Sequence, residues 1–298
     1  MLKINVDNFS LDQILRSGQC FRMEKLSENE YEEVYEIIAG NRYLKAGQME
    51  NTLCLYCEED EYEFWLQYFD LNHDYRIYID QINPRDTYLL EAARCACGVR
   101  ILRQDLWEMI VTFLVSQQNH IRRIRRCIAL LCEKYGEFIP FSDTLTDQEK
   151  LSADMPDHQE GISPSDAGNQ KKGYYTFPAP EVFAGLPEDA LMECSLGYRS
   201  KYVVRSAKQI VSGEVNLDRI MNLPYKEAKQ ELLRLFGVGE KVADCICLFS
   251  RHDLDAFPVD THIRQALDAH YKRGFPNRRY KGFRGVIQQY IFCYELWG

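Results

Sequence analysis

The stretch that decides the fold is residues 226–249, KEAKQELLRLFGVGEKVADCICLF. Its first part carries leucines at helical spacing and runs into Gly237-Val238-Gly239, and a second helix is predicted to begin near Glu240. Two glycines around one small apolar residue permit a tight hairpin beside a helix N-terminus, whose backbone N–H groups bind phosphate without reading base sequence. A sharp turn that binds no ligand would show the same pattern, so the residues that follow the hairpin must distinguish a phosphate site from a simple turn.

Two side chains near this hairpin have functional groups suited to covalent chemistry. Lys241 lies two residues past the second glycine, and Asp260 precedes a helical pattern in FPVDTHIRQAL. Lys241 could be a solvated surface lysine and Asp260 an ordinary helix N-cap. As a cap near a bound phosphodiester, however, Asp260 could also stabilise positive charge on a sugar. Lys241 could act as a nucleophile only when neutral, and at a pKa of about 10.4 roughly one molecule in a thousand is neutral near pH 7.4, so the site would have to desolvate the amine or crowd it with cations.

Working outward from the hairpin, the pattern predicts an α+β fold with two parts. Helical periodicity dominates residues 101–298, with a polar break at residues 116–120 between two apolar stripes. In residues 1–100, YEIIA and RYLKA flank Gly40-Asn41 as a β-hairpin, TLCLYC is a further strand, and EYEFWLQYF is a short amphipathic helix. We therefore expect an N-terminal α+β domain with an antiparallel sheet over residues 1–100 and a mostly helical catalytic region over residues 101–298, with the site between them.

Composition and charge narrow the class of protein. The 298 residues carry 36 basic and 45 acidic side chains, a net charge of −9, and the whole excess of acid falls within residues 1–100. Residues 119–135 hold five Lys or Arg against one Glu, and residues 261–298 hold seven basic against two acidic side chains. Basic segments on a neutral body fit a polyanionic partner, although the overall acidity argues against binding to nucleic acid by charge alone.

The expected cellular location of the protein follows mainly from signals that the sequence lacks. No apolar run reaches the roughly 18 to 20 residues of a membrane span, and we see no secretory, nuclear or mitochondrial signal, so we expect no membrane partner and a cytoplasmic protein of a prokaryote, or a nuclear one if the source is eukaryotic. Eleven cysteines fit free, buried thiols in a reducing compartment. The acidic, polar segment at residues 142–172 is expected to be a mobile surface connection.

The hairpin and the aspartate resemble a known family. LFGVGEKVADC followed by VDTH is similar to the signature of the helix-hairpin-helix DNA glycosylases with a Gly/Pro-rich loop and an Asp, and within them to the 8-oxoguanine DNA glycosylase/AP lyases. The resemblance implies a bifunctional DNA repair enzyme that excises 8-oxoguanine opposite cytosine, with Lys241 attacking C1′ of the damaged nucleotide and Asp260 supporting that step. It also implies a Schiff base and β-elimination 3′ to the lesion, a duplex DNA partner and a monomeric chain.

The resemblance extends to segments that would recognise the lesion and the gap it leaves. Flipping a nucleotide out of the duplex requires a filler for the gap, a holder for the orphan base and a pocket for the damaged base. For the pocket, the resemblance implies that Gly18 in SGQCFR accepts the N7 hydrogen of 8-oxoguanine, that Gln288 reads the Watson–Crick edge, and that Phe292, Cys245 and His262 also contact the substrate. For the duplex, it implies contacts from Gln118, Asn119, Arg123, Tyr198, Arg199, Gly237, Val238 and Gly239, with Gln118 in the gap, Tyr198 as a wedge, and both arginines at the cytosine.

Four features depart from the family pattern or limit its cofactors. Gln118 stands where asparagine is usual, and Glu295 stands where an aspartate near His262 is usual, so a carboxylate–imidazolium pair is still expected there. Past Cys247 the chain has one further cysteine, Cys293, so we expect no iron–sulfur cluster. The C-x2-C at Cys54 does not have the spacing of a zinc ribbon, and we expect neither a metal nor another cofactor.

Two alternatives stay open at this point. A monofunctional glycosylase for alkylated bases on the same fold would use Asp260 to assist water and would not need Lys241. A non-catalytic DNA-binding module would keep only the phosphate-binding hairpin. The second alternative gives no reason for Lys241, Asp260 and the pocket residues to occur together.

Overall fold

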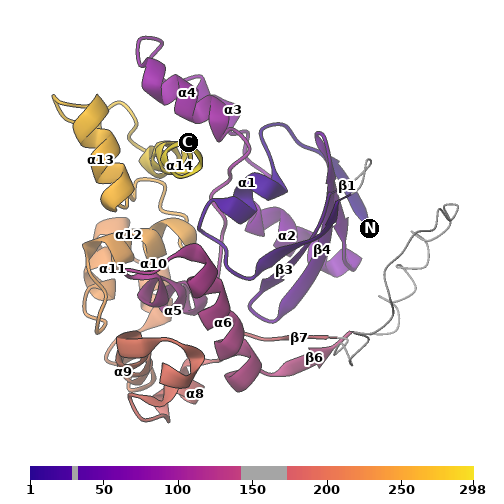
Figure 1. The fold of residues 1–298 in the computed structure, drawn as a ribbon, viewed down its shortest axis with the longest axis vertical. Coiled ribbons are helices and arrows are strands. Elements are labelled where there is room, and N and C mark those ends of the chain that lie inside the picture. The colour runs from indigo at the N-terminus through magenta and orange to yellow at the C-terminus, as the bar shows by residue number, and fades with distance from the viewer. Residues whose placement is uncertain (29–32, 142–172) are drawn as a thin grey trace, which may run out of the picture.

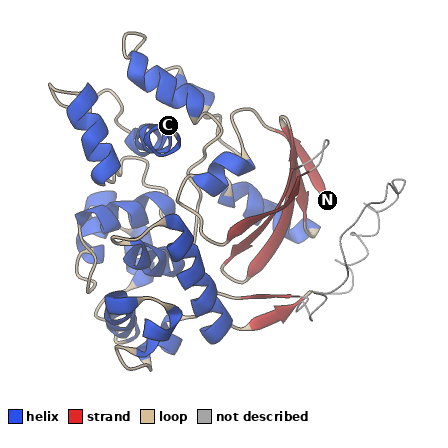
Figure 2. Cartoon of the chain, viewed as in Figure 1, coloured by secondary structure: helices blue, strands red, loops and turns tan. Residues whose placement is uncertain are grey.

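The structure, a computed structural model, describes residues 1–28, 33–141 and 173–298. A curved antiparallel sheet lies on one side of the molecule and helices make up most of the rest (Figures 1 and 2). This arrangement confirms the predicted α+β fold. The segment expected to be a mobile connection, residues 142–172, lies outside the described residues.

The N-terminal sheet has the strand order β1-β5-β4-β3-β2, and all its neighbours are antiparallel. The predicted hairpin is confirmed: Ala39 pairs with Arg42 across a turn in which Gly40 has a φ of +59°. A separate two-stranded ribbon, β6 with β7, flanks the helical part. The strands are β1 (Leu2–Asn5), β2 (Met23–Glu28), β3 (Glu33–Ala39), β4 (Arg42–Met49), β5 (Thr52–Tyr56), β6 (Phe138–Pro140) and β7 (Gly173–Tyr175).

The helices follow the predicted stripes closely. The helices are α1 (Leu11–Arg16), α2 (Tyr62–Tyr68), α3 (Arg76–Ile79), α4 (Thr87–Cys95), α5 (Leu106–Ser116), α6 (Ile121–Tyr135), α8 (Pro180–Ala184), α9 (Ser200–Val211), α10 (Leu217–Asn222), α11 (Tyr225–Leu232), α12 (Glu240–Phe249), α13 (Thr261–His270) and α14 (Arg284–Trp297). Short 3-10 turns cover Glu59–Glu61, Ala190–Cys194 and Gly197–Arg199. Among the described residues, no helix is both long enough and apolar enough to cross a bilayer.

Two hydrophobic cores hold these elements together. One core lies between the sheet, α1 and α2, and includes Trp65 and Phe69. The other fills the helical part and already includes Tyr75 and Leu89, because α4 packs against α14. Leu102 belongs to the sheet core and Phe21 to the helical core, so the two cores interleave along the chain, and the domain boundary expected near residue 100 stays a prediction.

Polar pairs tie the sheet to the helical part. The Arg22 guanidinium, just before β2, lies 3.2 Å from the Glu108 carboxylate on α5, and both side chains are buried. Burial raises the pKa of Glu108, and the positive charge of Arg22 offsets that rise only in part. Glu108 also accepts a hydrogen bond from the Gly40 backbone N–H. The α1–β2 segment that contains Gly18 is thereby held against α5.

Candidate active site

A cavity of about 890 Å³ opens where the α1–β2 loop meets the helical part. Its walls come from the α5–α6 turn, α12, the start of α13, and α14, and its size is within the roughly 300–1,000 Å³ range of small-molecule sites. The predicted site residues that line it are Gly18, Gln118, Asn119, Gly239, Lys241, Cys245, Asp260, His262, Gln288 and Phe292. Residues far apart in the sequence thus share one cavity, as the sequence predicts.

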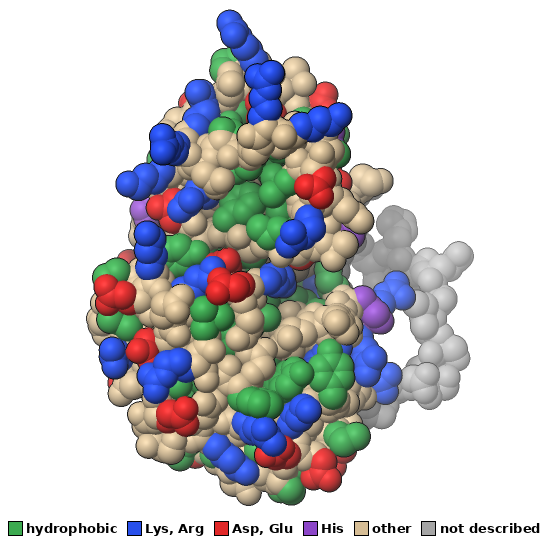
Figure 3. Space-filling view, turned by 90° about the vertical axis from the view of Figure 1, so that its left-hand side faces the viewer, with side chains coloured by type: hydrophobic (Ala, Val, Ile, Leu, Met, Phe, Trp, Pro, Cys, Tyr) green, Lys and Arg blue, Asp and Glu red, His purple; other side chains and the backbone are tan. Residues whose placement is uncertain are grey.

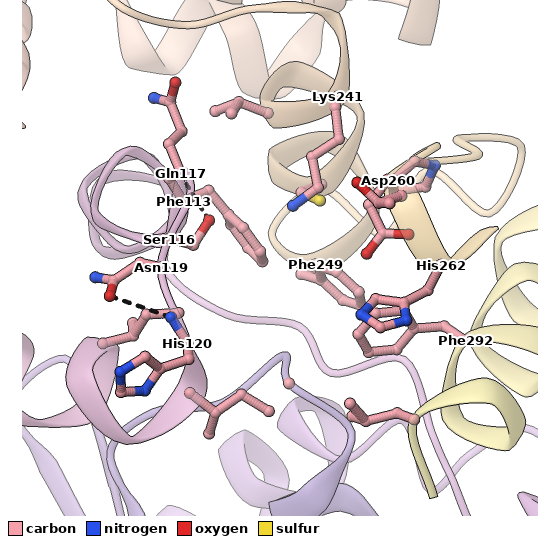
Figure 4. A pocket seen from close by; sticks show the side chains of 18 of the residues that line it. Phe113, Ser116, Gln117, Asn119, His120, Lys241, Phe249, Asp260, His262 and Phe292 are labelled. Atoms are coloured by element: carbon pink, nitrogen blue, oxygen red, sulfur yellow. Dashed lines mark hydrogen bonds between the residues drawn. The ribbon is translucent and has the colours of Figure 1, made fainter. Parts of the chain in front are cut away.

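Lys241 lies in the first turn of α12 and is partly buried. Its side chain extends into the cavity, and its Nζ lies 5.5 Å from the ring centroid of Phe113 on α5 (Figure 4). Phe113 stacks on Phe249 with ring centroids 5.5 Å apart, so aromatic surface replaces water on that side of the amine.

Cys245 lies one helical turn after Lys241 and is buried against the same cavity. Burial raises the pKa of the Cys245 thiol, and the charge and hydrogen bond of Lys241 offset only part of that rise. The thiol is therefore protonated at neutral pH and presents an uncharged, polarisable surface to whatever enters the cavity.

Asp260 is the N-cap of α13, as its position predicts. Its Oδ1 accepts a hydrogen bond of 2.8 Å from the backbone N–H of Ile263, which fixes the carboxylate at the positive end of the helix dipole. Figure 4 shows the Lys241 and Asp260 side chains directed toward the same central space, one from α12 and the other from the start of α13. An amine and a carboxylate group therefore face one volume.

Another part of the cavity wall, next to the Asp260 segment, is suited to hold a planar ring. Gly18 has a φ of +74°, which favours glycine, and a Cβ placed there would lie 3.5 Å from Cε1 of Phe292. Gln288 is buried, and its amide is held at both ends: Nε2 donates to the Pro258 carbonyl at 3.1 Å, and Oε1 accepts from Gln289 Nε2 at 3.2 Å. Gln289 itself is buried, and its Oε1 has no hydrogen-bond partner in the described part of the chain.

The expected pairing of Glu295 with His262 is wrong for this structure. Glu295 Oε1 accepts a hydrogen bond of 2.7 Å from the Tyr88 hydroxyl on α4, and His270 stacks on the Tyr88 ring. No ion pair joins Glu295 to His262 within residues 1–28, 33–141 and 173–298. His262 is exposed at the cavity and meets Phe292 edge-on, with ring centroids 6.5 Å apart.

The glycine hairpin takes its shape from an aromatic neighbour. Gly237 has a φ of +90°, and a Cβ there would lie 2.6 Å from Cγ of Tyr202 on α9. Val238 is buried in the core, whereas Gly239 is exposed and has open space where a Cβ would be. Gly239 is the N-cap of α12 and supplies no side-chain cap, so the first N–H groups of that helix are suited to an anion.

The turn between α5 and α6 is held by its own side chains. Gln118 is exposed and has a φ of +46°, the left-handed region that costs about 1–2 kcal/mol for a residue with a side chain. Asn119 Nδ2 donates to the Val115 carbonyl at 3.1 Å, and its Oδ1 accepts from the His120 N–H at 3.1 Å (Figure 4). Gln117 Nε2 donates to the Gly237 carbonyl at 3.0 Å, which joins this turn to the hairpin.

Arg199 is the main external support of this turn. It is only 4% exposed; Nε and Nη2 both donate to the Gln117 carbonyl, Nη2 also donates to the Gln118 carbonyl at 3.0 Å, and Nη1 donates to the Leu196 carbonyl at 3.3 Å. Its guanidinium carbon lies 4.5 Å from the Tyr198 ring centroid. The guanidinium therefore fixes both the left-handed turn and the neighbouring exposed tyrosine.

The family models divide the chain into two matched parts. Residues 1–110 match the 8-oxoguanine DNA glycosylase N-terminal domain, and residues 111–275 match the HhH-GPD superfamily of base excision DNA repair proteins. The chain belongs to the 8-oxoguanine glycosylases of the HhH-GPD superfamily. The family membership expected from the hairpin and aspartate signature is thus confirmed.

Individual glycosylases are similar to this chain over most of their length. A Clostridium acetobutylicum 8-oxoguanine glycosylase/lyase, in complex with double-stranded DNA containing cytosine opposite 8-oxoguanine, has a TM-score of 0.82 at 31% identity over 97% of this chain and 92% of that chain. A Saccharomyces cerevisiae N-glycosylase/DNA lyase is 27% identical over 305 residues, 91% of this chain and 70% of its own. A 3-methyladenine DNA glycosylase from Archaeoglobus fulgidus, at 17% identity and a TM-score of 0.67, shares the fold.

The other residues predicted to contact DNA lie outside the main cavity of this glycosylase. Arg123 is exposed and donates to the Ser195 carbonyl at 3.3 Å, and Tyr198 is 46% exposed beside Arg199. Gly237 and Val238 form the hairpin rather than the cavity wall. The contacts of all these residues with DNA stay predictions, and so do the roles of the residues that line the cavity.

Sequence reasoning missed several residues that shape this glycosylase site. These are Phe113 beside the lysine amine, Gln289 against Gln288, Gln117 on the hairpin carbonyl, and Tyr202 under Gly237. Each acts through a neighbour brought close by folding, so no local pattern marks it. One signal existed for Gln289: a second polar residue beside Gln288 in a mostly apolar helix.

Proposed function

We propose that this chain is a bifunctional 8-oxoguanine DNA glycosylase/AP lyase in which Lys241 is the nucleophile and Asp260 stabilises the reacting sugar. The observation that carries the proposal is the shared cavity, into which Lys241 and Asp260 project and which Gly18, Gln288 and Phe292 also line. The yeast relative is an N-glycosylase/DNA lyase and the clostridial relative an 8-oxoguanine glycosylase/lyase, and both support the same activity.

The chemistry proceeds at C1′ of the flipped nucleotide. The neutral Lys241 amine attacks C1′ and the glycosidic bond breaks, so that the base leaves with the electron pair and takes up a proton. The Asp260 carboxylate stabilises the positive charge that develops on the sugar. Ring opening gives a Schiff base between C1′ and Nζ; loss of a C2′ proton then expels the 3′ phosphate, and hydrolysis of the imine frees the lysine.

Other residues of the cavity wall select the oxidised base. 8-Oxoguanine carries a hydrogen on N7 that guanine lacks, and the Gly18 carbonyl is the proposed acceptor for it. Phe292 supplies one stacking surface and Cys245 the other, and Gln288 meets the Watson–Crick edge. Gln289 and Pro258 hold the Gln288 amide in one orientation, so recognition starts from a fixed donor and acceptor.

The residues of the α5–α6 turn and its neighbours contact the part of the duplex from which the damaged nucleotide has flipped out. Gln118 enters the gap, Tyr198 wedges the neighbouring step, and Arg123 meets the O2 and N3 acceptors of the orphan cytosine. Arg199 contributes mainly by holding the turn, because most of its donors are already used on backbone carbonyls. All the parts come from one chain, and we propose that the enzyme acts as a monomer, without a membrane partner, in the compartment that holds the DNA: the cytoplasm of a prokaryote, or the nucleus if the source is eukaryotic.

Replacing the proposed nucleophile tests this function. Lys241→Gln should lower the single-turnover rate of 8-oxoguanine release from an 8-oxoguanine:cytosine duplex by more than about a thousandfold, because it removes the attacking amine. Lys226→Gln, at an exposed position of α11, is the matched control and should leave the rate unchanged. Full activity in the Lys241 variant would refute the assignment.

Substrate choice separates this proposal from its neighbours on the same fold. The unaltered chain should release 8-oxoguanine and nick the strand, and should release 3-methyladenine far more slowly. Release of 3-methyladenine without nicking would favour a monofunctional alkylated-base glycosylase. Duplex binding without release of any damaged base would favour a non-catalytic module.

A further inference from the structure

A second, smaller cavity lies beside the active site and has an all-cationic or neutral lining. It measures about 400 Å³ and is formed by His120, Arg122, Arg123, Arg126 and Ser195. His120 and Arg122 line the main cavity as well, so the two hollows adjoin at the start of α6. No acidic side chain of the described residues is among those that form it.

Two arginines of this cavity, Arg122 and Arg126, make no contact that would stabilise the folded protein among the described residues. Arg122 and Arg126 are exposed, four residues apart on α6, and neither has an ion-pair or hydrogen-bond partner among the residues the structure describes. Like charges at this spacing repel each other, and cations in the first turn oppose the helix dipole. Some other arginines at the surface are paired with acids, as half-buried Arg205 is with Glu188 and exposed Arg234 with Glu231.

The far wall of the cavity is a fixed turn. Ser195 has a φ of +64°, and its carbonyl accepts hydrogen bonds from Arg123 Nη2 at 3.3 Å and from the Cys127 thiol at 3.5 Å. The turn leads directly to Tyr198, the proposed wedge. Arg123 is therefore oriented by Ser195, while Arg122 and Arg126 keep all their donors for a ligand.

We propose that Arg122 and Arg126 clamp backbone phosphates of the complementary strand, next to the base opposite the lesion. The inference rests on the proposed function, because it places the lesion strand along the hairpin and Lys241. The complementary strand then faces the α6 side of Gln118, where the second cavity lies and where neither Lys241 nor Asp260 forms a wall.

The clamp also accounts for how an acidic chain can hold DNA. Figure 3 shows Lys and Arg at many points of the face that includes α13, interspersed with Asp and Glu, so that face is mixed in charge. The α6 cluster is instead free of acids, and phosphate contacts position a protein on the duplex without reading bases. Binding energy is thereby concentrated beside the gap.

Salt dependence of binding measures the clamp without any chemistry. The probe is a duplex with a stable abasic analogue opposite cytosine, bound at several salt concentrations. The double variant Arg122→Gln/Arg126→Gln should reduce the slope of log affinity against log salt by about 1.8, or about 0.9 for each phosphate released. The double lysine variant should keep the slope, and Arg94→Gln, an exposed arginine on α4, should not change it.

Strand assignment comes from neutral methylphosphonate linkages placed beside the opposite base. Placed in the complementary strand, these linkages should abolish the difference in salt slope between the unaltered chain and the double glutamine variant. Placed in the lesion strand, they should leave that difference unchanged. An unchanged slope in the glutamine variant, or a difference abolished only by lesion-strand linkages, would overturn the proposal. Excision of 8-oxoguanine by the unaltered chain is scored separately, so failure of the function is distinguishable from failure of the clamp.

The melting temperature of the double glutamine variant separates a role in DNA binding from a role in the fold, because the two roles predict shifts in opposite directions. The double glutamine variant should melt about 1–2 °C higher than the unaltered chain, because charge repulsion at the helix start is removed. A lower melting temperature would mean that the arginines support the fold, against the proposal.

Discussion

The two sides of the active-site cavity are built differently. On the catalytic side, formed by the starts of α12 and α13, Lys241 and Asp260 sit on regular helix termini and keep their functional groups directed at the cavity. On the turn side, residues 117–120, the backbone is left-handed at Gln118 and is held from outside by Arg199. The proposed catalytic groups are thus placed by standard helix geometry, whereas the turn proposed to meet the gap in DNA depends on a strained backbone and its supports.

The catalytic side should lose most activity when its charge is removed without disturbing its cap. Asp260→Asn keeps a good N-cap but loses the negative charge, so the single-turnover rate of base release should fall by about a thousandfold. Asp105→Asn alters the N-cap of α5 in the same way at an exposed position. That control should excise normally, and an equal loss in both variants would show that capping, not charge, matters.

The hairpin that links the two sides should be sensitive to a single methyl group. Gly237→Ala adds strain at a φ of +90° and a clash with Tyr202, and should lower the free energy of unfolding by about 3 kcal/mol in denaturant titrations. Gly213→Ala, at a φ of +77° with nothing within 4 Å, incurs only the backbone strain. An equal loss of unfolding free energy in the two variants would show that the clash with Tyr202 does not contribute.

The turn side should depend on the fork of Arg199 more than on its charge. Arg199→Lys keeps the charge but cannot reach three carbonyls, so unfolding should become easier by about 2 kcal/mol. Arg123→Lys, at an exposed position, should change stability by less than about 0.5 kcal/mol while weakening discrimination for cytosine opposite the lesion. If Arg199→Lys kept its stability but lost discrimination for cytosine opposite the lesion, Arg199 would instead contact the cytosine directly.

The smallest expected effect concerns the far end of α12. Burial raises the pKa of Asp70, but His252 at 3.1 Å, together with Arg103 and His73, outweighs it and brings the pKa well below its ordinary value of 3.8. A depressed folded pKa contributes stability above the unfolded value, and that contribution is lost as pH falls below it. The stability advantage of the unaltered chain over Asp70→Asn should shrink by about 1 kcal/mol as the pH falls from about 5 to 3.

A neighbouring carboxylate provides the control for this pH dependence. Asp74 also has a lowered pKa, because the backbone N–H and side chain of Arg76 donate to it, but it is fully exposed to solvent. Asp74→Asn should therefore leave the stability curve nearly parallel to that of the unaltered chain. A pH-independent difference for Asp70→Asn would contradict the stabilising role assigned to the charged Asp70.

Sequence reading predicts where Lys241 and Asp260 lie in the fold better than it predicts the contacts of the turn side. Lys241 and Asp260 follow from local signals, a glycine hairpin and a helix start, which the fold reproduces. The Arg199 contacts could not be foreseen, because they need the 3-10 turn at Gly197–Arg199 to pack against a turn about eighty residues earlier. Glu295 shows the same limit: its partner is set by how α4 packs on α14, not by its place in a motif.

The most direct test of the central claim is to locate the covalent bond to DNA. Borohydride reduction of a reaction with an 8-oxoguanine:cytosine duplex should trap a protein–DNA complex, and peptide mapping should place the reduced link on Lys241. A link on another lysine or on the N-terminal amine, or the absence of any trapped complex while strands are still nicked, would contradict the account.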